Sequence, residues 1–345
     1  MLEETAKMKR SRDTNKANHE PTVPPSRFFL GLALSVLALW LAVRQVELDA
    51  VLAAFARADY GLVAAAVAVQ LAVLWAIAGR WGRLFRNPIP VSHLLRVLLI
   101  AQLANVVLPV RLGVLLRAYL VGQEARVSKT LVFGTVVAEK VLDSLMFVLL
   151  FVTVMPFVAP AWFRWSALPT STGLFLALFP AMVLVTVQRR RFLQLARAIL
   201  KRLPWAQRFA LPQRLETVLE GLSPLHGLRP VAVLWGWTLQ ISALGALVNI
   251  LVMRAFGIQA PWIAAFFLLA VLQMGARIPA PLGGIGIFQY LCVQALSFFS
   301  VDANLALSFG FMLHFVVFVP GSLLGALGLY RMHASLFKLK DVAGE

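Results

Sequence analysis

Long apolar blocks constrain the fold of this chain more than any other feature of its sequence. A helix needs about 20 mainly apolar residues to cross ~30 Å of hydrocarbon, and most of these blocks reach that length with a few flanking residues. The chain is 60% hydrophobic and only 14% charged, whereas soluble domains carry about 25% charged residues. We therefore expect an all-α integral membrane protein with no soluble catalytic domain. The blocks are Leu30–Val43, Gly61–Ala78, Leu131–Val154, Gly173–Val187, Val231–Val252, Pro261–Met274 and Ala303–Tyr330.

Positive charge gathers in patches beside these apolar blocks. The formal net charge is +17, a value that in a soluble protein would suggest nucleic-acid binding. Lys and Arg residues that flank membrane spans instead follow the positive-inside rule, which places them in the cytoplasm. We expect no nucleic-acid partner, a multi-pass protein of the bacterial inner (plasma) membrane with both termini cytoplasmic, and a basic face that attracts anionic lipid headgroups. The patches are Lys7–Arg27, Arg80–Arg86, Arg126–Lys129, Arg189–Arg229 and Arg331–Lys340.

Metal and cofactor chemistry have little support in the sequence. Cys292 is the single cysteine and lies in an apolar stretch, which excludes an internal disulfide and a cysteine-based zinc site. The histidines are scattered without metal-ligand spacing, so we expect no metal and no cofactor. Glu47 and Asp49 form an acidic pair of the kind that holds the metal of polyprenyl-linked glycosyltransferases. An interfacial helix, indicated by Val51, Leu52 and Phe55, is the favoured interpretation of that loop.

About six full spans and two broken apolar regions account for the membrane part of the chain. The broken regions, roughly 91–123 and 262–299, are too short on either side of a Pro/Gly break to span comfortably. We expect re-entrant hairpins there, and about eight membrane segments in all. The transmembrane domain is expected over 28–330, with a disordered basic cytoplasmic tail at 1–27, an amphipathic cytoplasmic segment at 189–229 and a second cytoplasmic tail at 331–345. The full spans are expected near 28–46, 61–79, 130–154, 171–188, 230–253 and 303–330.

The two breaks resemble each other in sequence. Leu108-Pro109-Val-Arg111-Leu-Gly113 pairs with Ile278-Pro279-Ala-Pro281-Leu-Gly283, and each follows a short apolar segment. The charge pattern has the first region enter the membrane from the inside and the second from the outside. Broken segments of opposite topology in the two halves of a chain are typical of inverted-repeat transporters, whose binding site lies between the breaks. We therefore expect an inverted-repeat architecture.

Several charged residues lie at or near membrane depth, where each costs about 2.5–3.5 kcal/mol on insertion scales. Glu139 and Asp143 are four residues apart and share a helix face, so they would repel each other without a nearby cation. Arg111 or Arg117 could neutralise them, and Lys140 could pair with Asp143. Two compatible interpretations stay open: a structural ion-pair cluster, or a water-filled cavity in which an arginine binds an anionic headgroup. The charged residues are Arg111, Arg117, Glu139, Lys140, Asp143 and Arg277.

The breaks also carry residues that shape the backbone. Gly283, Gly284 and Gly286 leave their N–H groups open to a bound anion at the start of a helix. The alternative is a tight turn that needs positive φ angles and holds no ligand. Asn105, just before the first break, is expected to hydrogen-bond the broken backbone. Asn249 and other lone polar side chains in the spans are expected to bond between helices.

Three motifs taken together resemble one membrane family. The first is Asn105-Val-Val-Leu-Pro109-Val-Arg111-Leu-Gly113, leading to Arg117; the second is Glu139-Lys140-Val-Leu-Asp143; the third is Ile278-Pro279-Ala-Pro281-Leu-Gly283-Gly284-Ile-Gly286-Ile-Phe288. Their order and spacing over about 30–330 resemble the flippase-like family of the lysylphosphatidylglycerol synthase transmembrane region. Three positions depart from the family pattern: Val114 and Gln289 stand where members often carry an acid, and Lys140 replaces the usual arginine.

The resemblance implies a lipid-handling membrane domain that stands alone, without the aminoacyl-transfer domain of the synthases. We expect a non-enzymatic protein that binds an anionic phospholipid or polyprenyl-linked lipid and helps move its headgroup across the inner membrane. The alternative is a non-catalytic accessory subunit whose partner is a lipid or glycan biosynthetic enzyme. The expected substrate-binding residues are Asn105, Pro109, Arg111, Gly113, Arg117, Glu139, Lys140, Asp143, Arg277, Pro279, Pro281, Gly283, Gly284, Gly286 and Gln289.

Overall fold

The computed structural model describes residues 25–44, 46–85, 87–107, 113–125, 127–158, 228–275 and 282–342. Every regular element in these ranges is helical, which confirms the all-α expectation for this part of the chain. The expected span at 171–188 and nearly all of the expected amphipathic segment at 189–229 lie outside the described residues. So do the first 24 residues of the amino-terminal tail.

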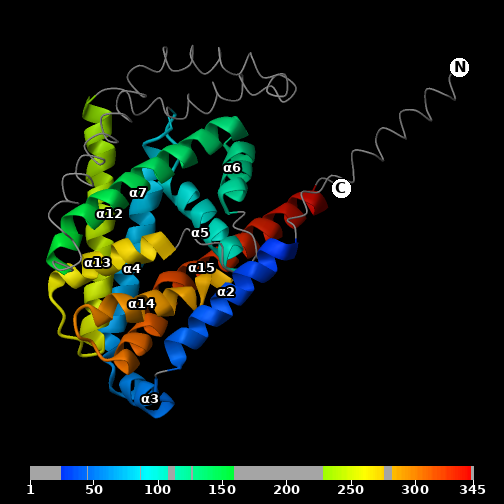
Figure 1. Cartoon of the computed structure of the whole chain (residues 1–345). Coiled ribbons are helices and arrows are strands. Elements are labelled where there is room, and N and C mark those ends of the chain that lie inside the picture. The colour runs from blue at the N-terminus through cyan, green and yellow to red at the C-terminus, as the bar shows by residue number, and fades with distance from the viewer. Residues whose placement is uncertain are drawn as a thin grey trace, which may run out of the picture.

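Ten helices and one short 3₁₀ turn are described, and Figure 1 shows their arrangement. They are α2 (Pro25–Val43), α3 (Leu48–Arg57), α4 (Tyr60–Gly82), α5 (Val91–Val107), α6 (Gly113–Glu124), α7 (Lys129–Val158), α12 (Leu228–Ala255), α13 (Trp262–Gly275), η2 (Leu282–Gly284), α14 (Ile287–Ser297) and α15 (Ala303–Val342).

Three of the described helices are long and apolar enough to cross a membrane. They are Tyr60–Gly82, Arg229–Ala255 and Ala303–Met332, which match the spans expected at 61–79, 230–253 and 303–330. The helix α7 is longer than α4 or α12 but carries Glu139, Lys140 and Asp143 in its middle. The helix α15 continues to Val342, past the expected end of its span.

The two broken regions fold as helix, break and helix, as the sequence indicates. In the first, α5 and α6 pack against each other across residues 108–112. In the second, α13 and α14 are joined through η2, and α5 packs against η2. The first region and the second break are therefore neighbours in the fold. Figure 1 shows both regions beside α15.

Close approach between long helices depends on small residues. The helix α15 lies along α5, and a side chain at Gly325 would collide with the backbone of Leu99. A side chain at Gly321, one turn earlier, would meet the side chain of Gln102. Glycines four residues apart let the two backbones come together where hydrocarbon offers little hydrophobic drive for association. This Gly-x-x-x-Gly contact is absent from the sequence-based expectations, although the spacing is readable in the sequence.

The apolar core forms two main clusters of buried side chains. One lies among α12, α13, α14 and α15 and includes Phe309 and Leu313. The other lies among α4, α5, α6 and α7, with the start of α12, and includes Trp81 and Leu142. The second cluster surrounds the charged residues of α7 and so determines what those charges meet.

The short helix α3 confirms that the loop after the first span is helical. Val51 is buried, whereas Leu48 and Leu52 are 69% and 66% exposed. Phe55 packs edge to face on Phe256, with ring centroids 5.4 Å apart. The next helix begins at once, because the Asp59 carboxylate accepts from the N–H groups at the start of α4.

Candidate functional site

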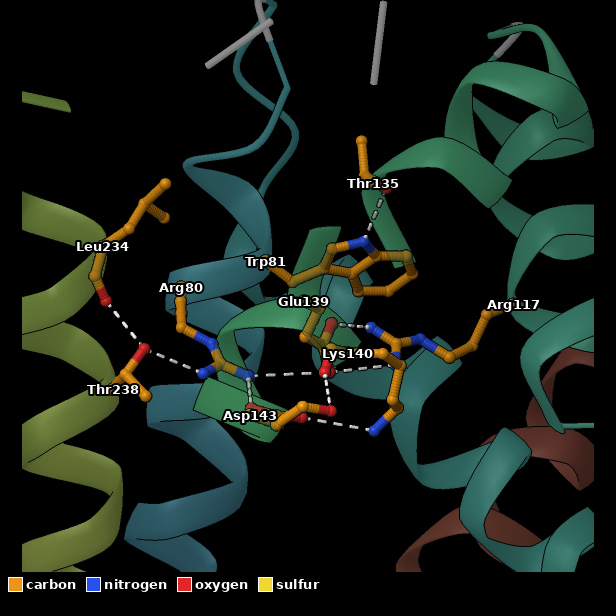
Figure 2. Close-up of polar contacts among 10 residues, drawn as sticks. Arg80, Trp81, Arg117, Thr135, Glu139, Lys140, Asp143, Leu234 and Thr238 are labelled. Atoms are coloured by element: carbon orange, nitrogen blue, oxygen red, sulfur yellow. Dashed lines mark hydrogen bonds and ion pairs between the residues drawn. The ribbon is translucent and has the colours of Figure 1, made fainter. Parts of the chain in front are cut away.

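An ion pair between α6 and α7 forms the centre of the candidate site. The Arg117 guanidinium donates through Nη2 to Oε2 of Glu139 at 2.6 Å and through Nη1 to Oε1 at 3.2 Å. Both side chains are buried. Two parallel bonds from one guanidinium to one carboxylate combine charge with fixed geometry. The sequence-based expectation that Arg117 could neutralise Glu139 is confirmed in this geometry, which Figure 2 shows.

Asp143 lies one turn further along α7 and takes its charge partner from α4. Its Oδ1 is 2.7 Å from Nη2 of Arg80, and the same nitrogen is 3.8 Å from Oε1 of Glu139. Arg80 also donates through Nη1 to Oγ1 of Thr238 on α12 at 3.0 Å. One guanidinium therefore joins three helices.

The position of Arg80 corrects the sequence analysis. The positive patch beside the second span placed Arg80 with Arg83 on the cytoplasmic flank. In the structure α4 continues to Gly82, and the Arg80 side chain is only 1% exposed. A hydropathy pattern locates the end of a span but does not tell which flanking residue is covered by neighbouring helices. The signal available in the sequence was the position of Arg80, a basic residue that still falls within the helical repeat of the span.

Trp81 provides a platform for the central pair. The Arg117 guanidinium carbon lies 3.9 Å from the Trp81 ring centroid, and the indole Nε1 donates to Oγ1 of Thr135 at 3.0 Å. Trp81 is completely buried. A cation over an indole face is attracted by the ring quadrupole, more strongly when water is excluded. Trp81 thus holds Arg117 against Glu139, a role that the sequence analysis missed.

Lys140 lies at the open edge of the network. Its Nζ is 3.3 Å from Oδ2 of Asp143, as the spacing of the two residues predicts. The Lys140 side chain is 60% exposed and that of Asp143 is 27% exposed, whereas Glu139 and Arg80 are closed in. The charged network therefore runs from a buried centre to an accessible edge.

The network has more positive than negative charge. Two arginines and one lysine face two carboxylates, so the sum of three positive and two negative charges is +1. The Nε atoms of Arg80 and Arg117 have no hydrogen-bond partner within the described ranges. A buried donor left without a partner costs about 1–3 kcal/mol. The network therefore combines excess positive charge with two buried donors that lack a partner in the described ranges.

The first break is closed by a side chain, as expected for Asn105. Its Oδ1 accepts from the N–H of Gly113, the first residue of α6, at 2.9 Å. A side chain at Gly113 would collide with Asn105 and with the Ala101 carbonyl. The start of α6 is therefore held close to α5, and Arg117 follows Gly113 by about one helical turn.

At the second break a side-chain oxygen again accepts a hydrogen bond from a glycine N–H, but here the side chain is that of Gln289. Oε1 of Gln289 accepts from the Gly286 N–H at 2.7 Å, and Gln289 is buried. Gly283, Gly284 and Gly286 have φ angles of 69°, 83° and 92°, in the region where side chains are disfavoured. The positive φ angles that the tight-turn interpretation requires are thus confirmed. The Gly286 N–H is taken by Gln289 and is not open to a ligand.

The predicted site residues fall into three groups. Arg117, Glu139, Lys140 and Asp143 meet in one network, and the residues of the breaks shape the two turns. The remaining five lie outside the described residues: Pro109, Arg111, Arg277, Pro279 and Pro281.

The expected role of Asn249 has an outcome in the structure. Asn249 donates to the Ala265 carbonyl at 2.9 Å, which confirms an interhelical bond between α12 and α13. No group of three or more His, Cys, Asp or Glu side chains with the geometry of a metal site occurs within the described ranges.

Comparison with known proteins gives a single assignment. The family model of the lysylphosphatidylglycerol synthase TM region matches residues 28–325, nearly the whole chain. No curated protein and no solved structure gives a significant match. The matched range includes the whole ion-pair network and both breaks, so the residues described above are part of the family domain. The chain belongs to the family of the lysylphosphatidylglycerol synthase transmembrane region.

Proposed function

We propose that this protein binds an anionic lipid, or a lipid-linked headgroup, and helps move that headgroup across the bacterial inner membrane. In this proposal it is not an enzyme, both termini are cytoplasmic and its partners are membrane lipids. The two broken regions form an inverted repeat around the binding site. Membership of a family of membrane domains related to lipid synthesis or flipping supports this proposal.

The observation that carries the proposal is the gradient of exposure along the network of Arg80, Arg117, Glu139, Lys140 and Asp143. A charge at bilayer depth is costly and is usually paired or functional. This network keeps one positive charge in excess, and its Lys140–Asp143 edge is accessible.

Exchange of ion-pair partners is the mechanism that the geometry favours. A headgroup phosphate arriving at the open edge would compete with Asp143 for Lys140 and Arg80. One singly charged phosphate diester would neutralise the network, while Arg117 and Glu139 remain paired beneath it. The polar groups would replace the water that the headgroup loses, and the acyl chains would stay in the bilayer. The affinity for lipid then depends on Lys140 and Asp143 at the edge, whereas the stability of the fold depends on Arg117 and Glu139 at the centre.

Mass spectrometry of lipids retained by the purified protein tests this function. The variant Lys140→Gln removes the exposed charge, and Arg254→Gln is the matched control because Arg254 is exposed at the far end of α12. We expect the wild type and the control to be enriched in one anionic lipid class relative to the bulk membrane. Lys140→Gln should lose most of that enrichment while remaining monodisperse.

A liposome assay then measures movement of the enriched lipid class. A fluorescent analogue should become accessible to a membrane-impermeant quencher faster in the presence of the wild type than of Lys140→Gln. Retained lipids identical to the bulk membrane in all three proteins would reject the proposal. A biosynthetic enzyme that copurifies under the same conditions would then favour an accessory role.

A further inference from the structure

A second basic feature lies beside the network, at the end of α4 and the start of α12. An open groove of about 240 Å³ is lined by Arg83, Arg229, Pro230, Val233 and Leu234. Its arginines come from two helices that are far apart in sequence and pack along each other. The positive-inside rule places this end of both helices at the cytoplasmic interface.

The two arginines of this groove are exposed and have no acidic partner among the residues that the structure describes. Positive flanks are common at cytoplasmic helix ends and by themselves determine only topology. Here, however, two guanidinium groups line one concave surface whose other walls are Pro230, Val233 and Leu234. Arginines beside an apolar wall match a molecule with an anionic head and an apolar body.

The groove is connected to the buried network through Leu234. The Leu234 side chain is buried, and its carbonyl accepts from Oγ1 of Thr238 at 2.8 Å. The same Thr238 oxygen accepts from Arg80 at 3.0 Å. Figure 2 shows this chain from Leu234 through Thr238 to Arg80. Arg83 lies three residues after Arg80, about one turn along α4.

We propose that Arg83 and Arg229 form a docking site for the phosphate of an anionic phospholipid headgroup in the cytoplasmic leaflet. A lipid would reach this site before it reaches the buried network. The inference therefore rests on the proposed function. The phosphate lies between the two guanidinium groups, and the first acyl carbons lie along Val233. Lipid that has docked at Arg83 is about one helical turn of α4 away from Arg80.

Native mass spectrometry of the full chain in detergent tests the site. The protein is titrated with phosphatidylglycerol and, separately, with zwitterionic phosphatidylcholine. Compared with the wild type, the variant Arg83→Ala/Arg229→Ala should bind phosphatidylglycerol about tenfold more weakly or worse, because two charge-assisted contacts are lost. Phosphatidylcholine binding should not change. The variant Arg83→Lys/Arg229→Lys should recover part of the affinity.

Arg254→Ala is the control for loss of exposed positive charge, since it removes one arginine from the exposed opposite end of α12. It should bind phosphatidylglycerol as the wild type does. Because Arg83 and Arg229 are exposed, the alanine variants should keep the thermal midpoint of the wild type, which verifies that they are folded. Equal loss of phosphatidylglycerol binding in Arg254→Ala would overturn the site in favour of a diffuse charge effect.

Three further results distinguish failure of this site from failure of the proposed function and from binding of a free anion. If Lys140→Gln loses phosphatidylglycerol binding but Arg83→Ala/Arg229→Ala keeps it, the groove is rejected and the proposed function stands. If the wild type shows no preference for phosphatidylglycerol over phosphatidylcholine, both are rejected for this class of lipid. If the arginine pair binds inorganic phosphate while phosphatidylglycerol binding is unchanged in the double variant, the groove is a free-anion site and the lipid assignment fails.

Discussion

Arg117 and Glu139 are joined by two hydrogen bonds in the interior of the helical domain, with the guanidinium lying on the face of Trp81. Arg117 belongs to the first broken region and Glu139 to the long helix α7. The pair therefore ties the broken region to a continuous helix. It anchors the more exposed charges of Lys140 and Asp143, at which we propose that lipid binds.

Breaking the central pair should destabilise the protein strongly. In Glu139→Gln the Arg117 charge stays buried with a neutral partner, and leaving one member of a buried pair uncompensated costs about 3–5 kcal/mol. The thermal midpoint in detergent should fall clearly below that of the wild type. The double variant Arg117→Met/Glu139→Leu should recover much of the loss because both charges of this pair are removed together. An unchanged midpoint in Glu139→Gln would contradict the buried position of this pair.

Trp81→Phe should have a smaller effect on stability. Phenylalanine keeps an aromatic face for Arg117 but loses the hydrogen bond that the indole donates to Thr135. We expect the free energy of unfolding to fall by about 1–2 kcal/mol, mostly because the hydrogen bond to the Thr135 hydroxyl is lost and the packing is reduced. Trp262→Phe is the control, because Trp262 is 68% exposed. Thermal unfolding followed by intrinsic fluorescence measures both, and equal midpoints would argue against the platform role of Trp81.

Gly325→Ala should weaken the contact between α15 and α5. The added methyl group would collide with the backbone of Leu99, and overpacking of this kind costs about 1–3 kcal/mol. Gly236→Ala on α12 is a matched control, since nothing lies within 4 Å of a Cβ there. The control should be neutral or stabilising by up to about 1 kcal/mol, because alanine favours helix more than glycine. Relative to the wild type, the thermal midpoint should fall in Gly325→Ala and stay unchanged or rise in Gly236→Ala.

Asn105→Ala should loosen the start of α6. The substitution removes the acceptor of the Gly113 N–H, and loss of such a cap costs about 1 kcal/mol. Hydrogen–deuterium exchange should increase at the first turn of α6 and remain unchanged in α12. Asn105→Asp keeps an acceptor oxygen and should exchange more slowly than the alanine variant. Identical exchange in all three proteins would contradict the cap.

Much of the fold and part of the site are readable from the sequence. Charge-free apolar blocks predict α4, α12 and α15, because a helix needs about 20 mainly apolar residues to cross the hydrocarbon layer. Proline and glycine mark the two breaks, since neither residue continues a helix well. The four-residue spacing of Glu139 and Asp143 determines their common face. Asn105 is recognisable as a cap from its place before a break.

Only the tertiary structure decides which charges meet. The sequence offers several arginines of equal hydropathy near the membrane boundary, and it does not tell which of them is covered. The packing of α4 between α7 and α12 buries Arg80 and leaves Arg83, about one turn away, exposed to the groove. Trp81, Thr135 and Thr238 enter the network for the same reason. Local sequence patterns are enough to locate where helices begin, break and carry charge, whereas the pairing of those charges follows from contacts between helix faces, because such contacts involve residues far apart in the chain.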